Sequence, residues 1–206
     1  MAPTKISKTS IRLLGCAAVV SLLVAGGAVV AATSQAAMFV QKAATEAIAI
    51  LSNKSLADQD RRAQFRAAIL KHFDAPAIGQ FVVQPYWSRA SPEQQSRFQS
   101  VFAGTLAKIY TDRFYDYDGQ SLQIKSIQAG APGTTMVRST ISTPTGRNVY
   151  DVDWIVTGPA GREKFLDVVI DGVSTSTTTK QDYGSFLRQA NGNLDALTAA
   201  LKARAN

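Results

Sequence analysis

The sequence of 206 residues contains one cysteine, Cys16, and one histidine, His72. Cys16 lies in an N-terminal segment that we expect to be removed, so the remaining chain has no cysteine. Disulfides, a thiolate nucleophile and metal sites with cysteine ligands are therefore excluded from the remaining chain. The sequence also lacks a Gly-Lys-Ser/Thr phosphate loop, so we expect no direct use of a nucleotide. We predict neither a cofactor nor a metal site.

The first 36 residues have the pattern of a secretion signal. Basic residues precede an apolar run from residue 13 to residue 32, and small residues follow it at Ser34 and Ala36, where a signal peptidase acts. We expect cleavage after Ala36, which leaves residues 37–206 as a single domain secreted across the inner membrane.

Two alternatives to a cleaved signal stay open. The apolar run approaches the roughly 20 residues of a spanning helix, which would make it a retained membrane anchor. Gly26, Gly27 and the small residues at its end favour removal. A lipidated Cys16 is less well supported, because only two leucines separate Arg12 from Gly15.

Removal of the N-terminal segment lowers the formal net charge from +7 to about +4, because Lys5, Lys8 and Arg12 are lost and no acidic residue is lost. The remaining basic charge is mild and spread along the chain. We therefore expect no nucleic-acid partner.

Helical and strand-like patterns follow one another in blocks. Helices are predicted at about residues 38–52, 58–73, 76–84 and 92–117, four strands at 121–128, 134–142, 147–157 and 163–173, and two further helices at 180–190 and 192–204. Turns rich in Gly and Pro separate the strands at intervals typical of consecutive hairpins. This order predicts an α+β domain. Ser91 is expected to cap the fourth helix, with Pro92 as its first residue, and Asp58 is expected to cap the second helix.

Apolar residues form one stripe on each of the first two predicted helices. The stripes contain Val40, Ala44, Ala47, Ile48 and Leu51 on the first helix, and Phe65, Ala68, Ile69 and Phe73 on the second. In the third strand, Tyr150, Val152, Trp154 and Val156 share one face.

The fourth strand is apolar on both faces around Val168, which predicts a central place covered on both sides. Helices packed on a curved, mostly antiparallel four-stranded sheet would enclose an apolar cavity. This design resembles the NTF2-like cone, which many unrelated functions share.

Ten of the seventeen Phe, Tyr and Trp residues lie between Phe73 and Tyr117. Four of them, Phe98, Phe102, Tyr110 and Phe114, recur at helical spacing, which ordinarily indicates a hydrophobic core. The same enrichment suits a segment that encloses an apolar ligand.

Several short motifs occur in a characteristic order. They are Phe73-Asp74, Tyr86-Trp87, the helix start Ser91-Pro92-Glu93-Gln94-Gln95, Tyr110, Asp118-Gly119 and the strand end from Asp167 to Ser174. In this order and combination the chain resembles the periplasmic phospholipid-carrier family of Mla-type lipid transport, also called toluene-tolerance or auxiliary transport proteins. The resemblance covers residues 38 to 204.

The resemblance implies a periplasmic shuttle without enzymatic activity. Such a protein carries phospholipid between an outer-membrane lipoprotein complex and an inner-membrane ABC transporter complex, and so maintains the lipid asymmetry of the outer membrane. Directional energy would come from the partner ATPase, and the carrier itself would be a monomer.

The resemblance also suggests which residues contact lipid. The candidates are Val82, Tyr86, Trp87, Phe102, Leu106, Tyr110, Val152, Trp154 and Val168. Arg89 and Arg113 are candidates to lie near a phosphate, but a solvated surface charge is the simpler interpretation of both.

Two other functions stay open. A carrier of a hopanoid-type lipid would have the same architecture. A small hydrolase or isomerase would need acid–base groups, and His72 with Asp74 or Asp151 with Asp153 are the candidate pairs. Residues two apart on a helix do not face each other, and charged residues on an outer strand face are usually structural. For Asp167, inside an apolar strand, we expect an arginine or backbone partner.

Overall fold

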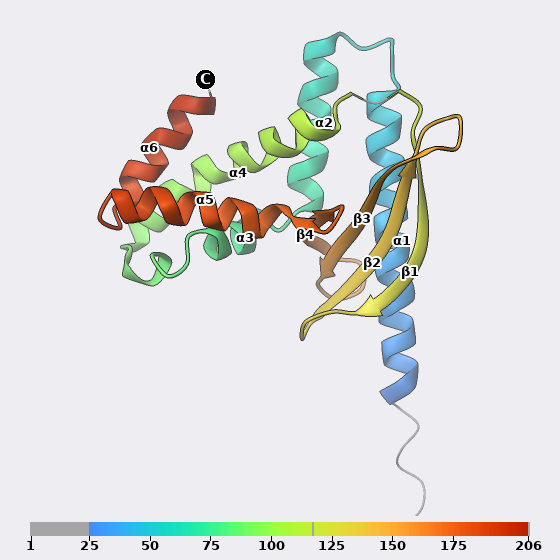
Figure 1. Ribbon diagram of the computed structural model, residues 1–206, viewed down its shortest axis with the longest axis horizontal. Helices are drawn as coiled ribbons and strands as arrows, with labels where there is room; N and C mark the ends of the chain where they lie inside the picture. Colours follow the sequence, from blue (N-terminus) through green and yellow to red (C-terminus); the bar gives the residue numbers. More distant parts are fainter. Residues whose placement is uncertain (1–24, 117, 206) are drawn as a thin grey trace, which may run out of the picture.

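The computed structural model describes residues 25–116 and 118–205, and it has an α+β fold, as predicted (Figure 1). The helices are α1 (Ala25–Leu51), α2 (Asp58–His72), α3 (Ala75–Val82), the 3-10 turn η1 (Trp87–Arg89), α4 (Pro92–Phe114), α5 (Thr175–Gln189) and α6 (Leu194–Ala205). The strands are β1 (Ser121–Ala129), β2 (Thr134–Ser142), β3 (Asn148–Thr157), β4 (Lys164–Ile170) and β5 (Val173–Ser174).

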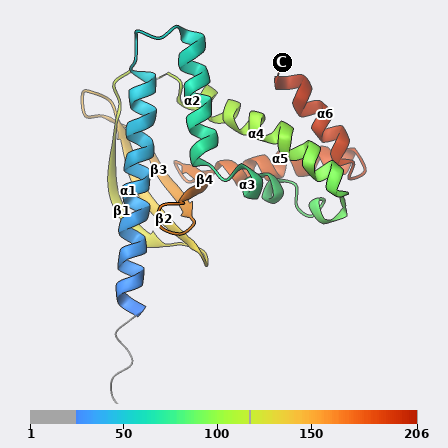
Figure 2. The same cartoon turned by 180° about the vertical axis from the view of Figure 1, so that it is seen from behind.

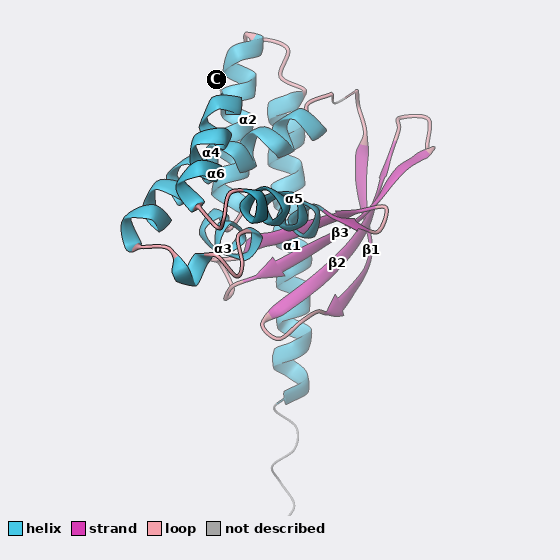
Figure 3. Ribbon diagram, turned by 60° about the vertical axis from the view of Figure 1, so that its left-hand side comes forward, coloured by secondary structure: helices cyan, strands magenta, loops and turns pink. Residues whose placement is uncertain are grey.

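The strands form one antiparallel sheet in the order β1-β2-β3-β4-β5. Consecutive strands are neighbours, so the predicted hairpins are confirmed. The sheet has five strands rather than four, because Asp171 and Gly172 take positive φ angles of 49° and 82° and reverse the chain into the two-residue β5. Irregular pairing in β1 and between β3 and β4 increases the twist of the sheet (Figure 3).

The helices form two groups around the sheet. α1 runs across one face of the sheet and packs on β1, β2 and β3, and α2 packs against both α1 and α4 (Figure 2). α3, α4, α5 and α6 pack together beside the β4 end of the sheet. Within the described residues, no helix combines the length and the apolar character needed to cross a membrane.

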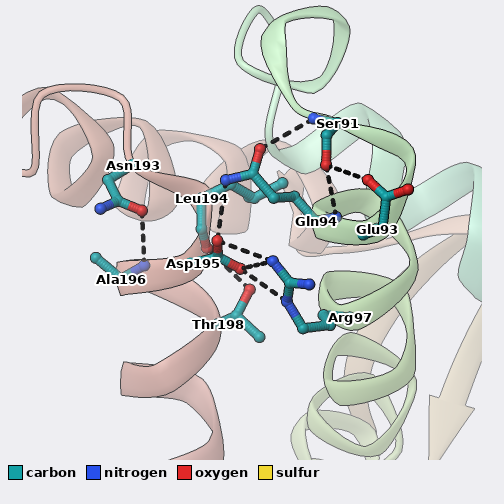
Figure 4. Close-up of polar contacts among 9 residues, drawn as sticks. All are labelled: Ser91, Glu93, Gln94, Arg97, Asn193, Leu194, Asp195, Ala196 and Thr198. Atoms are coloured by element: carbon teal, nitrogen blue, oxygen red, sulfur yellow. Dashed lines mark hydrogen bonds and ion pairs between the residues drawn. The ribbon is translucent and has the colours of Figure 1, made fainter.

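The start of α4 confirms the predicted cap. The Ser91 hydroxyl accepts a hydrogen bond from the backbone N–H of Gln94, and the side-chain oxygen of Gln94 accepts one from the backbone N–H of Ser91. Pro92 begins the helix. Arg97 donates to both carboxylate oxygens of Asp195 at 2.9 and 3.0 Å, and Gln94 donates to the same carboxylate at 2.9 Å (Figure 4). These contacts join α6 to α4.

One predicted helix cap and one predicted helix start are wrong. Asp58 is the first residue of α2 rather than its cap, and its carboxylate pairs with Arg61 and Arg62 at 2.8 and 2.9 Å. α1 is already helical at Ala25, the first described residue, so the predicted start at residue 38 and the predicted cleavage position Ala36 both lie inside α1, and Ala36 is buried. Residues 1–24, which hold most of the predicted signal, and Tyr117 lie outside the described residues, and cleavage stays a prediction.

The predicted central place of the fourth strand is also wrong. β4 lies between β3 and the two-residue β5, next to the edge of the sheet. Its apolar character has another cause: α3 and α5 pack on it, and Phe165, Val168 and Ile170 belong to the hydrophobic core.

The threonine-rich segment after Ser174 is helical, although the sequence predicted a helix only from residue 180. Asp167 explains this early start, because its carboxylate accepts hydrogen bonds from the Ser174 hydroxyl at 2.5 Å and from the Ser176 backbone N–H at 2.9 Å. Ser174 in turn accepts from the backbone N–H of Thr177. The expected backbone partner of Asp167 is confirmed, and this carboxylate holds the N-terminus of α5 on β4.

Replacing Asp167 by alanine should lower the free energy of unfolding by about 2 kcal/mol, because hydrogen bonds to a charged group are lost and the α5 N–H groups lose their acceptor. Urea unfolding followed by circular dichroism measures the change. Asp182→Ala is the matched control, since Asp182 is exposed on α5 and belongs to no ion pair of the described residues. Equal loss in both variants would contradict the role given to Asp167.

Candidate functional site

An apolar cavity of about 290 Å³ lies between α1, α2 and the sheet. The helices contribute Val40, Ala43, Ala44, Ala47, Ile48 and Leu51 from α1, and Phe65, Ala68, Ile69 and His72 from α2, followed by Phe73. The remaining walls are Arg113, Asp116, Gln120, Ser121, Leu122, Ile141, Tyr150, Trp154 and Phe165. The size is at the lower end of the roughly 300–1,000 Å³ typical of ligand pockets.

Short side chains create this space. Ala43, Ala44 and Ala47 of α1 and Ala68 of α2 all line the cavity. Their spacing of one, three or four residues in α1 places the three methyl groups on one side of the helix. Because a methyl group reaches less far than the leucine or valine of a filled core, the helices and the sheet leave a gap between them.

Three aromatic rings form the floor of the cavity. Phe165 lies with its ring centroid 5.1 Å from that of Trp154 and 5.2 Å from that of Phe73. The position of Phe73 is determined by its backbone, which bridges to Phe165, and by the Asp74 N–H, which donates to the Phe165 carbonyl at 2.9 Å. We call Phe73, Trp154 and Phe165 the aromatic floor.

Polar residues gather at one end of the cavity. Arg113 and Asp116 come from the end of α4, Gln120 and Ser121 come from the segment that enters β1, and Tyr150 follows from β3. Leu122, Ile141 and Tyr150 are neighbours across β1, β2 and β3, which places this polar end beside the start of β1.

One ionic cluster joins α1 to α2 beside the cavity. Glu46 accepts from Lys71 at 2.8 Å and lies 2.9 Å from Nε2 of His72. The hydrogen bond from Lys71, with a further contribution from His72, lowers the pKa of the Glu46 carboxyl below its ordinary value.

The candidate acid–base residues all have structural contacts. The partner of His72 is Glu46, whereas Asp74 accepts the backbone N–H of Ala77 at 3.0 Å and caps α3. Asp153 pairs with Arg138 at 2.8 Å. The backbone of Asp151 exchanges two hydrogen bonds with Asp171, at 2.8 and 2.9 Å. Across the described residues, no group of three or more His, Cys, Asp or Glu side chains could hold a metal ion.

Of the nine candidate lipid contacts, Trp154 lines the cavity. Six others are buried in the core: Val82, Phe102, Leu106, Tyr110, Val152 and Val168. Tyr86 and Trp87 are half-buried around η1. Direct contact of these eight residues with lipid stays a prediction.

Sequence reasoning did not assign the α1 and α2 walls to the site. All nine residues of the two predicted apolar stripes line the cavity, from Val40 to Leu51 and from Phe65 to Phe73. The signal was therefore present in the sequence. An apolar stripe predicts a buried helix face, but it does not reveal whether the space that faces it is filled.

Comparison with known proteins agrees with this architecture. Residues 41–203 match the MlaC protein family. The chain belongs to the MlaC family. Over 125 residues it is 25% identical to the toluene tolerance protein ttg2D of Pseudomonas putida. That alignment covers 59% of this chain and 57% of the relative, so the chain spans little more than half the length of ttg2D.

A solved structure has the same fold as this MlaC family member. It is a phospholipid-binding protein of Ralstonia solanacearum, determined in complex with a phospholipid. The TM-score is 0.67 at 24% sequence identity, and the match covers 82% of this chain and 95% of the other.

The ionic cluster gives the stability of this MlaC family member a defined pH dependence. Because the folded-state pKa of Glu46 is below its ordinary value of 4.5, its carboxylate stabilises the folded chain above that value. This contribution is lost as the pH falls through the lower folded-state pKa. Glu46→Gln should therefore be less stable than the parent at neutral pH, and the difference should vanish in acid.

Urea unfolding of both proteins at a series of pH values measures this difference. Glu163→Gln is the matched control, because Glu163 belongs to no ion pair of the described residues. A difference between parent and Glu46→Gln that stays constant from neutral to acid pH would contradict the role of the carboxylate charge.

Proposed function

We propose that this MlaC family member is a periplasmic lipid-binding shuttle that encloses the acyl chains of a phospholipid. The observation that carries the proposal is the cavity between α1, α2 and the sheet, which is apolar along its walls and polar at one end. An amphipathic lipid has the same division into an apolar and a polar part. The fold shared with a phospholipid-binding protein supports this assignment.

The energy of lipid transfer explains why a cavity is needed. Moving one methylene out of a bilayer costs about 0.8 kcal/mol, so two chains of roughly thirty methylenes cost about 24 kcal/mol unless other apolar contacts replace the bilayer. Enclosure alone can supply these contacts, and no proton-transfer group is required. His72, Asp151 and Asp153 therefore have structural roles only, whereas a hydrolase would use them as acid–base groups.

Two acyl chains need more room than the present cavity offers. The aromatic floor separates this cavity from deeper core residues, since Phe73 also contacts Tyr110 at a centroid distance of 4.3 Å. We infer that a bound lipid displaces the floor and reaches the second layer of predicted contacts, which includes Tyr110, Val152 and Val168. The predicted contact residues would then line the cavity of the lipid-bound protein.

Membership of the MlaC family supports a role in lipid exchange between membranes. The secreted chain would act as a monomer in the periplasm and exchange phospholipid with an outer-membrane lipoprotein complex and an inner-membrane ABC transporter complex. This exchange would maintain outer-membrane lipid asymmetry, with energy supplied by the partner ATPase. A carrier of a hopanoid-type lipid is the alternative, and mass spectrometry of lipid extracted from the purified protein distinguishes the two.

Trp154 provides a direct test of lipid entry, because it is part of the aromatic floor. In a Trp87→Phe variant, Trp154 is the remaining tryptophan. Phospholipid with brominated acyl chains should quench its fluorescence, because bromine quenches at contact, whereas unbrominated phospholipid should not. Unchanged fluorescence with brominated lipid, together with no lipid recovered from the protein, would refute enclosure in this cavity.

Filling the cavity should displace lipid. Ala47→Phe adds a ring where α1 faces the gap, and loss of contact to two methylenes already corresponds to about tenfold weaker binding. We expect at least this loss in titrations with phospholipid vesicles, with a normal circular dichroism spectrum. Ala63→Phe is the control, because Ala63 is exposed on α2 and does not line the cavity. Equal binding by both variants would place the lipid elsewhere.

A further inference from the structure

Two opposite charges at the polar end of the cavity have no ion-pair partner among the residues that the structure describes. Arg113 and Asp116 both line the cavity and are exposed. Neither forms an ion pair within 4.0 Å among the described residues, although they are only three positions apart. The side-chain contact of Arg113 is a long hydrogen bond of 3.4 Å to the Thr175 hydroxyl, which occupies one of its five N–H donors.

Tyr115 lies between the two charges in the chain and attaches this segment to α2. Its hydroxyl donates to the Asp58 carboxylate at 2.7 Å and accepts from Nε of Arg61 at 2.9 Å. The guanidinium carbon of Arg62 lies 3.7 Å from the centre of the Tyr115 ring. The end of α4 is thereby attached to the start of α2, which limits the movement of the two charges flanking Tyr115.

The charges match a specific kind of head group. A guanidinium presents a planar fork of donors that suits the oxygens of a phosphate, and a carboxylate suits an ammonium group. Tyr150, a residue that is 45% exposed, adds a hydroxyl at the same end, and Leu122 begins the apolar wall beside it. A lipid seated with its chains along that wall would bring its head group to Arg113 and Asp116.

We propose that the polar end of the cavity is a head-group site for zwitterionic phospholipid, in which Arg113 binds the phosphate and Asp116 binds the ammonium group. This inference rests on the proposed lipid-binding function and adds a preference among lipids. It assigns the two side chains different tasks, so each can be tested with a different lipid.

The test uses three dihexanoyl lipids that share their acyl chains: phosphatidylethanolamine, phosphatidylglycerol and diacylglycerol. Each lipid carries bromine on its acyl chains and is titrated into the Trp87→Phe protein, where quenching of Trp154 fluorescence reports binding. Arg113→Gln should weaken the binding of both phospholipids by about tenfold and leave the binding of diacylglycerol unchanged, because only diacylglycerol lacks the phosphate. Asp116→Asn should weaken the binding of phosphatidylethanolamine alone, because phosphatidylglycerol has no ammonium group.

Arg66→Gln and Asp60→Asn are the matched controls, as both residues are exposed on α2 and neither lines the cavity. Unchanged phospholipid binding in Arg113→Gln, or an equal loss for diacylglycerol, would overturn the phosphate site. Equal effects of Asp116→Asn on the two phospholipids would overturn the ammonium site. A parent protein that binds none of the three lipids would instead contradict the proposed function itself, and with it the head-group site.

Discussion

The packing of α1 on the sheet and on α2 through short side chains is the constraint on which the rest of this structure depends. Methyl groups at Ala43, Ala44, Ala47 and Ala68 leave about 290 Å³ unfilled where a globular domain of this size would ordinarily be close-packed. An empty apolar cavity loses dispersion contacts and lowers stability. The walls of the cavity must therefore be held in place by contacts outside the cavity.

Those contacts lie around the cavity rather than across it. Glu46 joins α1 to Lys71 and His72 of α2, and Tyr115 joins the end of α4 to Asp58 at the start of α2. Phe73 and Asp74 bind the end of α2 to β4. These contacts hold α1 and α2 around the gap between the helices and the sheet. A lipid that enters would replace the missing dispersion contacts, which couples binding to stability.

The sequence predicted local features well where a short-range cause exists. The cap formed by Ser91, Gln94 and Pro92 depends on residues within one helical turn, and the hairpins depend on glycines at turns such as Gly133 and Gly146, whose φ angles are 79° and 82°. α5 was predicted too short, because its first turn is stabilised by Asp167 from β4. The place of β4 was mistaken for a related reason: an apolar strand indicates burial, but burial here comes from α3 and α5 rather than from neighbouring strands.

The sequence by itself determined the α+β order of elements, the apolar stripes and, through a set of motifs, the resemblance to phospholipid carriers. Only the tertiary structure decided which of these apolar faces line a cavity and which are packed core. The spacing of apolar residues shows which side of a helix or strand avoids water. This spacing is the same whether the interface on that side is filled or contains a cavity. Whether an apolar face lines a cavity or belongs to the packed core depends on the side chains that lie opposite that face. Phe102 faces other rings, at 5.5 Å from Phe98 and 6.4 Å from Tyr183, whereas the alanines of α1 face a gap.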